Sequence, residues 1–272
     1  MLFLTTKQIS KLFFNSSRWT ANKRMRMLLD AGLVRVWVRA LAQDNIYSLD
    51  SAGAKALRKN EQDNANERFA DEMQEKYPTP KGLDGNIDHL LAINSVRIAI
   101  ALGLPALGAE LVWWRSDWEL RAASRAGIIS DALFLIRWPD TERRFALELD
   151  NNTRSVKSFL KKMLRYQAMA GNAELCVLMV GRDARWLERY RQALMQTNLD
   201  IKVFFTTLNL IDNCCTADVW ISANGIRYSL QNIAYVPNGK ENECAASHRN
   251  EGASPNGSSS YIPDLKGSFC NR

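Results

Sequence analysis

The sequence predicts an α/β (α+β) protein in which a small basic domain precedes a larger domain with a mixed central sheet. Its 272 residues are 46% hydrophobic and 24% charged, a globular composition that excludes collagen-like, mucin-like and wholly disordered chains. Segments with helical spacing of apolar residues are interleaved with segments that alternate as strands do. The excess positive charge, in addition, lies at one end of the chain.

The charge distribution separates residues 1–60 from the rest. They contain eleven Lys and Arg against three Asp and Glu, a net charge of +8. Residues 61–272 contain twenty-five Lys and Arg against twenty-six Asp and Glu, a net charge of −1. A basic segment on a near-neutral body predicts a polyanionic partner for residues 1–60.

Residues 1–60 have the order of a winged helix-turn-helix, in which two helices joined by a tight turn precede a hairpin. Gly32 ends the second helix, and Asp50 or Ser51 begins the last one. The predicted elements are a helix after Thr5 and Thr6, a turn at 15–17, a helix over 18–30, strands over 33–39 and 46–49, and a helix to about Lys59.

The second of these helices has one apolar face, formed by Ala21, Met25, Leu28 and Leu29. Its other side, with the following strand, carries side chains of the kinds that contact phosphates and base edges. The alternative is a small basic α/β domain without a role on DNA. The predicted DNA-binding residues are Arg18, Thr20, Asn22, Lys23, Arg26, Arg35 and Arg39.

The rest of the chain is predicted to form a linker, an α/β domain and a tail. Residues 61–86 are polar and end in Pro and Gly, and residues 237–272 are rich in Asn, Gly, Ser and Glu, which predicts disorder. Residues 87–236 form the second domain. Its predicted elements are helices over 87–102, 153–170 and 184–197, and strands over 110–121, 128–138, 145–150, 175–180 and 201–207.

Cysteine usage and hydropathy predict a cytoplasmic protein. The five cysteines form no disulfide framework and no zinc spacing, and the sequence contains only two histidines. The longest apolar stretch, residues 90–114, is interrupted by Asn94, Arg97, Pro105 and Glu110, so no membrane span is predicted.

Four acidic residues of the second domain are candidate catalytic groups. Glu148 and Asp150 are two apart on a predicted strand and so share one face. A hairpin brings Asp131 beside Glu148, and Glu119 could supply a fourth carboxylate. Carboxylates gathered at a sheet edge suit Mg²⁺ or Mn²⁺, with Asp131 and Glu148 as the predicted metal ligands.

The basic helix that follows supplies candidate lysines, Lys157, Lys161 and Lys162. A lysine beside a metal-held water is suited to phosphodiester hydrolysis. Three alternatives stay open: ordinary charges at a strand end, a solvated helix face, or ion pairs between lysines and carboxylates without a metal. His89 is interpreted as structural or substrate-facing rather than as a metal ligand.

Several stretches of the chain together resemble the replication-relaxation family of bacterial and plasmid proteins. In the first domain these are residues 4–9, 26–34 and 46–53, and in the second they are 89–94, 114–121, 130–133 and 145–150, with Thr153, Lys162 and Tyr166. The resemblance implies a winged helix followed by a domain similar to the PD-(D/E)XK nuclease fold. It also implies a nuclease-like metal site at Glu119, Asp131 and Glu148.

The chain departs from that nuclease pattern at Asp150, where the pattern has a lysine. Lys162 from the next helix is the best substitute. Otherwise the domain is catalytically silent and serves as a binding platform.

The basic first domain predicts DNA binding, and the resemblance implies that the protein is an accessory of plasmid or mobile-element replication and relaxation, with or without metal-dependent nicking. The alternative is a winged-helix transcription regulator whose α/β domain serves assembly or ligand sensing. The expected partners are double-stranded DNA, relaxase or replication proteins and a second copy of the chain, but no membrane.

Overall fold

The structure, a computed structural model, describes residues 1, 3–39, 43–61, 87–123, 129–151, 154–170 and 175–236. Residues Met1–Pro237 group as one compact unit. The predicted tail, and the predicted linker beyond residue 61, lie outside the described residues. The predicted domain boundaries therefore remain predictions.

The N-terminal elements follow the predicted order. Thr5 begins the first helix with a reciprocal capping box, in which its hydroxyl accepts from the Gln8 amide and the Gln8 side chain accepts from the Thr5 amide. Ser17 caps the second helix through the Thr20 amide. The elements are β1 (Leu4–Thr5), α1 (Thr6–Phe13), α2 (Arg18–Asp30), β2 (Val34–Trp37), β3 (Ile46–Leu49) and α3 (Ser51–Glu61).

The three N-terminal strands form a small antiparallel sheet in the order β1-β3-β2. Ile9, Ala21, Met25 and Tyr47 form a core between α1, α2 and this sheet. Ala21 and Met25 belong to the apolar face predicted for the second helix, so the opposite face of α2 is left to solvent.

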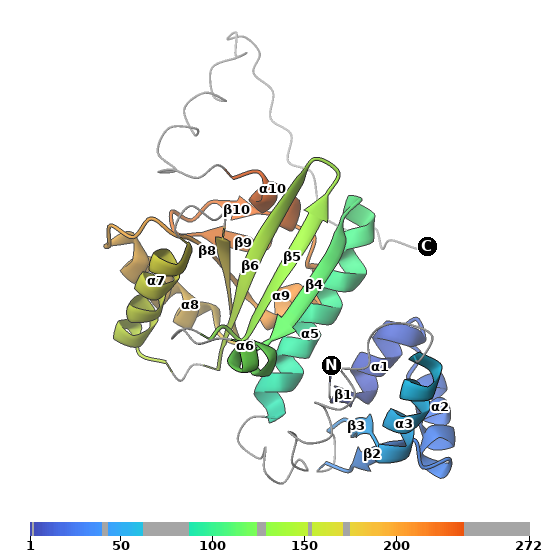
Figure 1. Cartoon of the computed structure of the whole chain (residues 1–272). Coiled ribbons are helices and arrows are strands. Elements are labelled where there is room, and N and C mark those ends of the chain that lie inside the picture. Colours follow the sequence, from blue (N-terminus) through green and yellow to red (C-terminus); the bar gives the residue numbers. More distant parts are fainter. Residues whose placement is uncertain are drawn as a thin grey trace, which may run out of the picture. The chain divides into compact units, whose positions relative to one another are not determined.

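A seven-stranded mixed sheet forms the centre of the rest of the unit, in the order β10-β9-β8-β7-β6-β5-β4 (Figure 1). β6, β7 and β8 are parallel, and the strands on either side of them pair antiparallel. This confirms the predicted α/β class with a mixed sheet. The strands are β4 (Glu110–Ser116), β5 (Ala132–Trp138), β6 (Thr141–Asp150), β7 (Leu175–Gly181), β8 (Lys202–Thr207), β9 (Trp220–Ser222) and β10 (Arg227–Tyr228).

Helices cover both faces of the large sheet. One face packs against α5 (Ile87–Gly103), α9 (Leu208–Cys214) and α10 (Leu230–Ala234), and the other against α7 (Val156–Ala170) and α8 (Ala184–Met195). Successive side chains of β6 point to opposite faces of the sheet. Leu147 and Leu149 pack in the core under α5, and Ala146 packs in the core under α7 and α8. Glu148 and Asp150 therefore point toward α7 and α8.

The helical segment Ile87–Leu107 has the length and mean hydropathy, 1.8, of a candidate membrane span. In this structure it packs as a core helix, because its side chains Ile93, Val96 and Ile100 are buried against the large sheet. Its hydropathy is thus accounted for by burial within the chain.

One predicted strand is wrong in its second half. Residues 110–121 were expected to be extended, but β4 ends at Ser116 and a helix, α6 (Asp117–Ala123), follows. The Glu119 carboxylate accepts a hydrogen bond of 2.7 Å from the Ser116 amide, which is half of a capping box. The sequence Ser116-Asp-Trp-Glu119 carries that helix-start signal, and the tryptophans around it obscured it.

Candidate functional site

The acidic residues predicted from the sequence lie at the C-terminal end of β6, where β6, β7 and β8 end together. Glu148 has no exposed surface and Asp150 is also buried. Ligands of α/β sheets bind at the carboxyl ends of parallel strands, so this edge is the candidate site.

Glu148 is held by three side chains from the segment that follows it. The Lys162 ammonium lies 2.6 Å from its carboxylate, the Arg154 guanidinium lies 3.1 Å from it, and the Tyr166 hydroxyl donates a further hydrogen bond. Burial and the nearby charge of Asp131 raise the pKa of Glu148, and Lys162 and Tyr166 offset only part of this. Burial and the Glu148 charge likewise raise the pKa of Tyr166, which keeps its proton for the hydrogen bond.

Of the three predicted lysines, one reaches the carboxylates. Lys162 contacts Glu148, whereas Lys157 and Lys161 are exposed on α7. Helical spacing explains the difference, because Phe159, Met163 and Tyr166 form the buried face of α7 and Lys162 lies at its margin.

Asp131 lies just before β5 and binds His89 from the first turn of α5. The His89 Nε2 atom is 3.2 Å from one Asp131 oxygen, and the Leu149 amide donates to the other at 2.7 Å. Burial lowers the pKa of His89, but the hydrogen bond and charge of Asp131 outweigh burial and leave that pKa raised. Burial raises the pKa of Asp131, but His89 and the Leu149 amide leave it below its usual value. The pair is therefore an ion pair when His89 is protonated.

Asp150 has partners that the sequence analysis did not anticipate. The Trp186 indole donates to its carboxylate at 3.0 Å, and the Tyr190 hydroxyl donates to the same oxygen. Both residues belong to α8, which lies more than thirty residues after Asp150 in the sequence and reaches it by packing on the same face of the sheet. Their spacing of four residues on one helix was the only local signal, and by itself it indicates a shared helix face but not a carboxylate partner.

Glu119, the fourth predicted carboxylate, is used locally as the cap of α6. Within the described ranges no group of three His, Cys, Asp or Glu side chains could hold a metal ion. Both Asp131 oxygens and the Glu148 carboxylate are already bonded to protein groups. With these contacts in place the arrangement is a poor fit for Mg²⁺ or Mn²⁺, and Asp131 and Glu148 as metal ligands stay a prediction.

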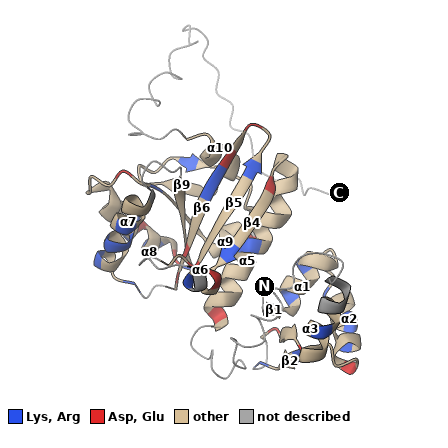
Figure 2. Ribbon diagram, in the orientation of Figure 1, with Lys and Arg blue, Asp and Glu red and all other residues tan. Residues whose placement is uncertain are grey.

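The predicted DNA-binding face of α2 is exposed. Asn22, Lys23 and Arg26 lie opposite the buried Ala21 and Met25. Figure 2 shows Lys and Arg along α2 and in the neighbouring α1 and α3. Thr20, by contrast, is half-buried and its hydroxyl bonds to Ser17 at 2.8 Å, so it belongs to the helix cap.

Three of the predicted arginines are held by carboxylates. Arg18 pairs with Asp44, Arg35 makes two hydrogen bonds to Asp50, and Arg39 pairs with Asp88 at 2.7 Å. The Arg35 guanidinium, with the Ser51 hydroxyl and amide, holds the pKa of Asp50 well below its usual range. These arginines can meet a phosphate only by sharing or exchanging their partners.

Trp19 is a surface feature that the sequence analysis missed. Its side chain is 72% exposed on α2, and the Lys23 ammonium lies 5.3 Å from its ring centroid. Met27, one turn further, is also exposed. An exposed indole between cations was detectable from the helical spacing of Trp19, Lys23 and Arg26.

A family model described as "Replication-relaxation" matches residues 1–177. The chain belongs to the Replication-relaxation family. Membership associates it with replication or relaxation in plasmids and mobile elements. No curated protein matches the sequence significantly. Among solved structures, it is similar to an XisH family protein from Nostoc punctiforme at 11% identity, with 43% of this chain and 94% of that chain covered and a TM-score of 0.28. A score that low assigns no fold.

The Replication-relaxation match includes the exposed face of α2 and the Glu148 cluster with Lys162 and Tyr166. It ends within β7, so α8 with Trp186 and Tyr190 lies beyond it. The partners of Asp150 are therefore supplied from outside the matched region.

Proposed function

We propose that this Replication-relaxation protein is a cytoplasmic double-stranded DNA-binding accessory factor of plasmid or mobile-element replication and relaxation, and that residues 1–60 bind the duplex as a winged helix. The single observation that carries the proposal is the exposed stripe of Trp19, Asn22, Lys23 and Arg26 on α2. It lies opposite the face of α2 that packs on α1 and the small sheet.

The order of elements supports this use of α2. In a helix-turn-helix the second helix lies in the major groove, and its exposed side chains reach base edges and phosphates. The turn before α2 is sharp, since Asn15 and Ser16 have φ of 46° and 65°. The β2–β3 hairpin then supplies the wing, with Arg35 on its exposed side.

The charge of this region supports binding to a polyanion. Residues 1–60 have a net charge of +8, and Arg24 and Arg26 are exposed with no acceptor among the described residues. Cations that are not bound to carboxylates are free to replace counterions on phosphate, which provides sequence-independent affinity.

The part of the chain after residue 86 is proposed to act as a platform for relaxase or replication proteins or a second copy of the chain. A transcription regulator remains the alternative function, with the same DNA-binding face and a different partner. Relaxation of a supercoiled plasmid in the presence of the partner would favour the first role. Repression of a promoter without any effect on plasmid topology would favour the second.

Duplex binding tests the proposal directly. Fluorescence anisotropy with labelled duplex DNA should show binding by the full chain and a clear loss in Lys23→Ala/Arg26→Ala. Lys161→Ala, which removes an exposed lysine from α7, is the matched control and should bind as wild type does. Equal binding by all three proteins would refute the proposed role of α2.

Metal-dependent nicking is tested separately with supercoiled plasmid and Mg²⁺ or Mn²⁺. Because the described carboxylates are bonded to protein groups, we expect no cation-dependent nicking. A Mn²⁺-dependent rise in melting temperature that is lost in Asp131→Asn would instead support the metal site predicted from the sequence.

A further inference from the structure

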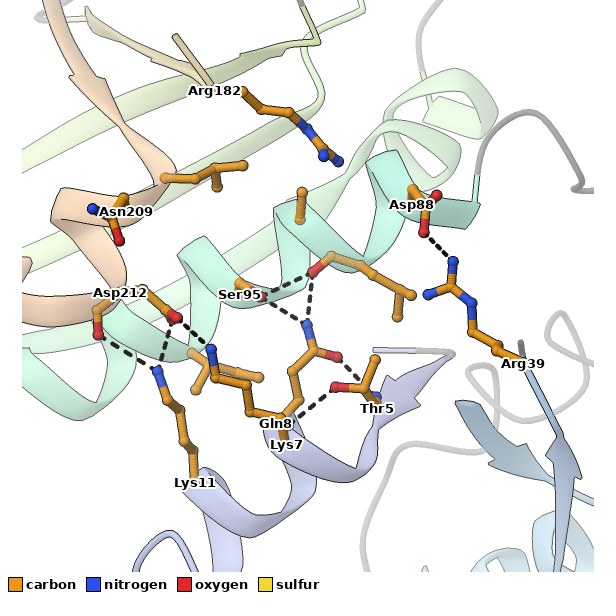
Figure 3. Close-up of a pocket in the computed structure, with 14 residues that line it drawn as sticks. Thr5, Lys7, Gln8, Lys11, Arg39, Asp88, Ser95, Arg182, Asn209 and Asp212 are labelled. Atoms are coloured by element: carbon orange, nitrogen blue, oxygen red, sulfur yellow. Dashed lines mark hydrogen bonds and ion pairs between the residues drawn. The ribbon is translucent and has the colours of Figure 1, made fainter. Parts of the chain in front are cut away.

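A cleft lined by both charged and apolar side chains lies beside α1, against α5 and α9 (Figure 3). Its volume is about 350 Å³. That volume lies at the lower end of the range for small-molecule sites, roughly 300–1,000 Å³.

The cleft has more positive than negative charge. Lys7 and Lys11 both bind one carboxylate, that of Asp212, at 2.9 and 2.7 Å. Two ammonium groups on one carboxylate leave a surplus cation. Arg182 adds another cation, because its guanidinium donates at 2.9 Å to the neutral Asn151 side chain. The remaining ion pair of the lining, Arg39 with Asp88, is balanced.

The helix α1, which carries Lys7 and Lys11, is held on α5 by contacts of Gln8 that are independent of the lysine charges. The Gln8 amide donates to the Leu91 carbonyl at 2.7 Å and to the Ser95 hydroxyl at 2.9 Å, which fixes α1 on α5. Gln8 is itself buried. The two lysines, one turn apart on α1, are therefore held on the same side of the cleft before any ligand arrives.

The rest of the lining suits an uncharged ring system rather than a second anion. Ala92, Ile98 and Leu208 give the cleft an apolar part. The Asn209 side chain lines it as well, and makes no hydrogen bond within the part of the chain that the structure describes. An amide offers both a donor and an acceptor, as recognition of a heterocycle requires.

We propose that this cleft binds a small phosphate-bearing ligand of mononucleotide size, with its phosphate on Lys7 and Lys11 and its ring against Leu208 and Asn209. Lysine binds phosphate as a point charge, and two lysines sharing one carboxylate keep enough charge to do so. Such a ligand would bridge α1 to α9. This inference does not depend on whether α2 binds DNA.

Calorimetric titration of the full chain with adenosine monophosphate tests the proposal, with inorganic phosphate and adenosine as separate probes. Wild type should bind adenosine monophosphate, and Lys7→Ala/Lys11→Ala should weaken that binding about tenfold or more. Asp212→Asn should tighten it, because the competing carboxylate is removed. Lys161→Ala is the matched control and should change nothing.

Asn209→Ala distinguishes recognition of the ring from recognition of the phosphate. It should weaken binding of adenosine monophosphate but not of inorganic phosphate. If Lys7, Lys11 and Asp212 only hold α1 on α9, no phosphate compound will bind wild type or Asp212→Asn at millimolar concentration, and the proposal is wrong. Binding of a 5′-phosphorylated oligonucleotide without binding of adenosine monophosphate would also overturn it. Circular dichroism of each variant verifies that it is folded.

Discussion

Lys162 and Glu148 are fourteen residues apart in sequence, yet the lysine ammonium lies 2.6 Å from the glutamate carboxylate. The glutamate has no exposed surface, and the lysine side chain keeps 19% of its own. A carboxylate so deeply buried needs its partners, since desolvation of an unpaired charge costs several kcal/mol. The relationship favours the ion-pair interpretation of these residues over a metal centre.

Glu148→Gln should therefore lower the free energy of unfolding, by about 2–4 kcal/mol, because a neutral amide with one acceptor oxygen replaces the charged carboxylate that Lys162 and Arg154 contact. Lys162→Met should lower the free energy of unfolding by less than Glu148→Gln does, since Arg154 and Tyr166 still bind the carboxylate. Chemical denaturation measures both. Lys157→Met, an exposed lysine on the same helix, should stay within about 0.5 kcal/mol of wild type. A more stable Glu148→Gln protein would mean that carboxylate repulsion dominates the site instead.

The His89–Asp131 pair should make stability depend on pH. The pKa of His89 is raised in the folded protein, so its contribution is complete below its unfolded pKa, about 6.5, and is lost as pH rises through the folded value. Wild type should thus lose more stability than His89→Asn between about pH 6 and pH 8. The pKa of Asp131 is lowered, so its contribution disappears only at acid pH.

Thermal melts of wild type and His89→Asn at several pH values measure this effect. The sequence contains one other histidine, His248, which is outside the described residues, and His248→Asn is the control. Parallel stability curves for wild type and His89→Asn would show that the pair is not formed.

Glu119 should act as a helix cap rather than a catalytic group. Glu119→Ala removes the acceptor of the Ser116 amide and should cost about 1 kcal/mol of stability. Glu119→Gln keeps an acceptor at the same place and should be close to wild type. If an activity is found for the chain and Glu119→Gln abolishes it without loss of stability, the catalytic prediction from the sequence is right.

Trp19 and Arg26 should affect DNA binding differently. Arg26→Ala removes a cation, and if it contacts phosphate it should reduce the slope of log affinity against log salt by about one. Trp19→Ala should weaken binding at every salt concentration with the slope unchanged, because an indole releases no counterion. Titrations with duplex DNA over a range of salt concentrations measure both slopes. Unchanged affinity in both variants would place the DNA-binding surface elsewhere.

The sequence by itself determined the α/β class, the N-terminal helices and hairpin, and the common face of Glu148 and Asp150. These features depend on short-range periodicity: 3.6 residues in helices and two in strands. The same periodicity separated the buried Ala21 and Met25 from the exposed Lys23 and Arg26. Local patterns gave a wrong prediction where two of them overlapped. At Ser116 the tryptophan-rich segment indicated a continuing strand, whereas the capping-box sequence indicated the start of a helix, which is what the structure has.

Only the tertiary structure decided which partner each charged side chain has. His89 reaches Asp131 from α5, Trp186 and Tyr190 reach Asp150 from α8, and Lys7 and Lys11 meet Asp212 across about 200 residues. No periodicity encodes such pairs, because they depend on strand order and on which helix covers which face of the sheet. The charge that a carboxylate keeps depends in turn on those partners and on its burial, so the chemistry of the site follows from the packing.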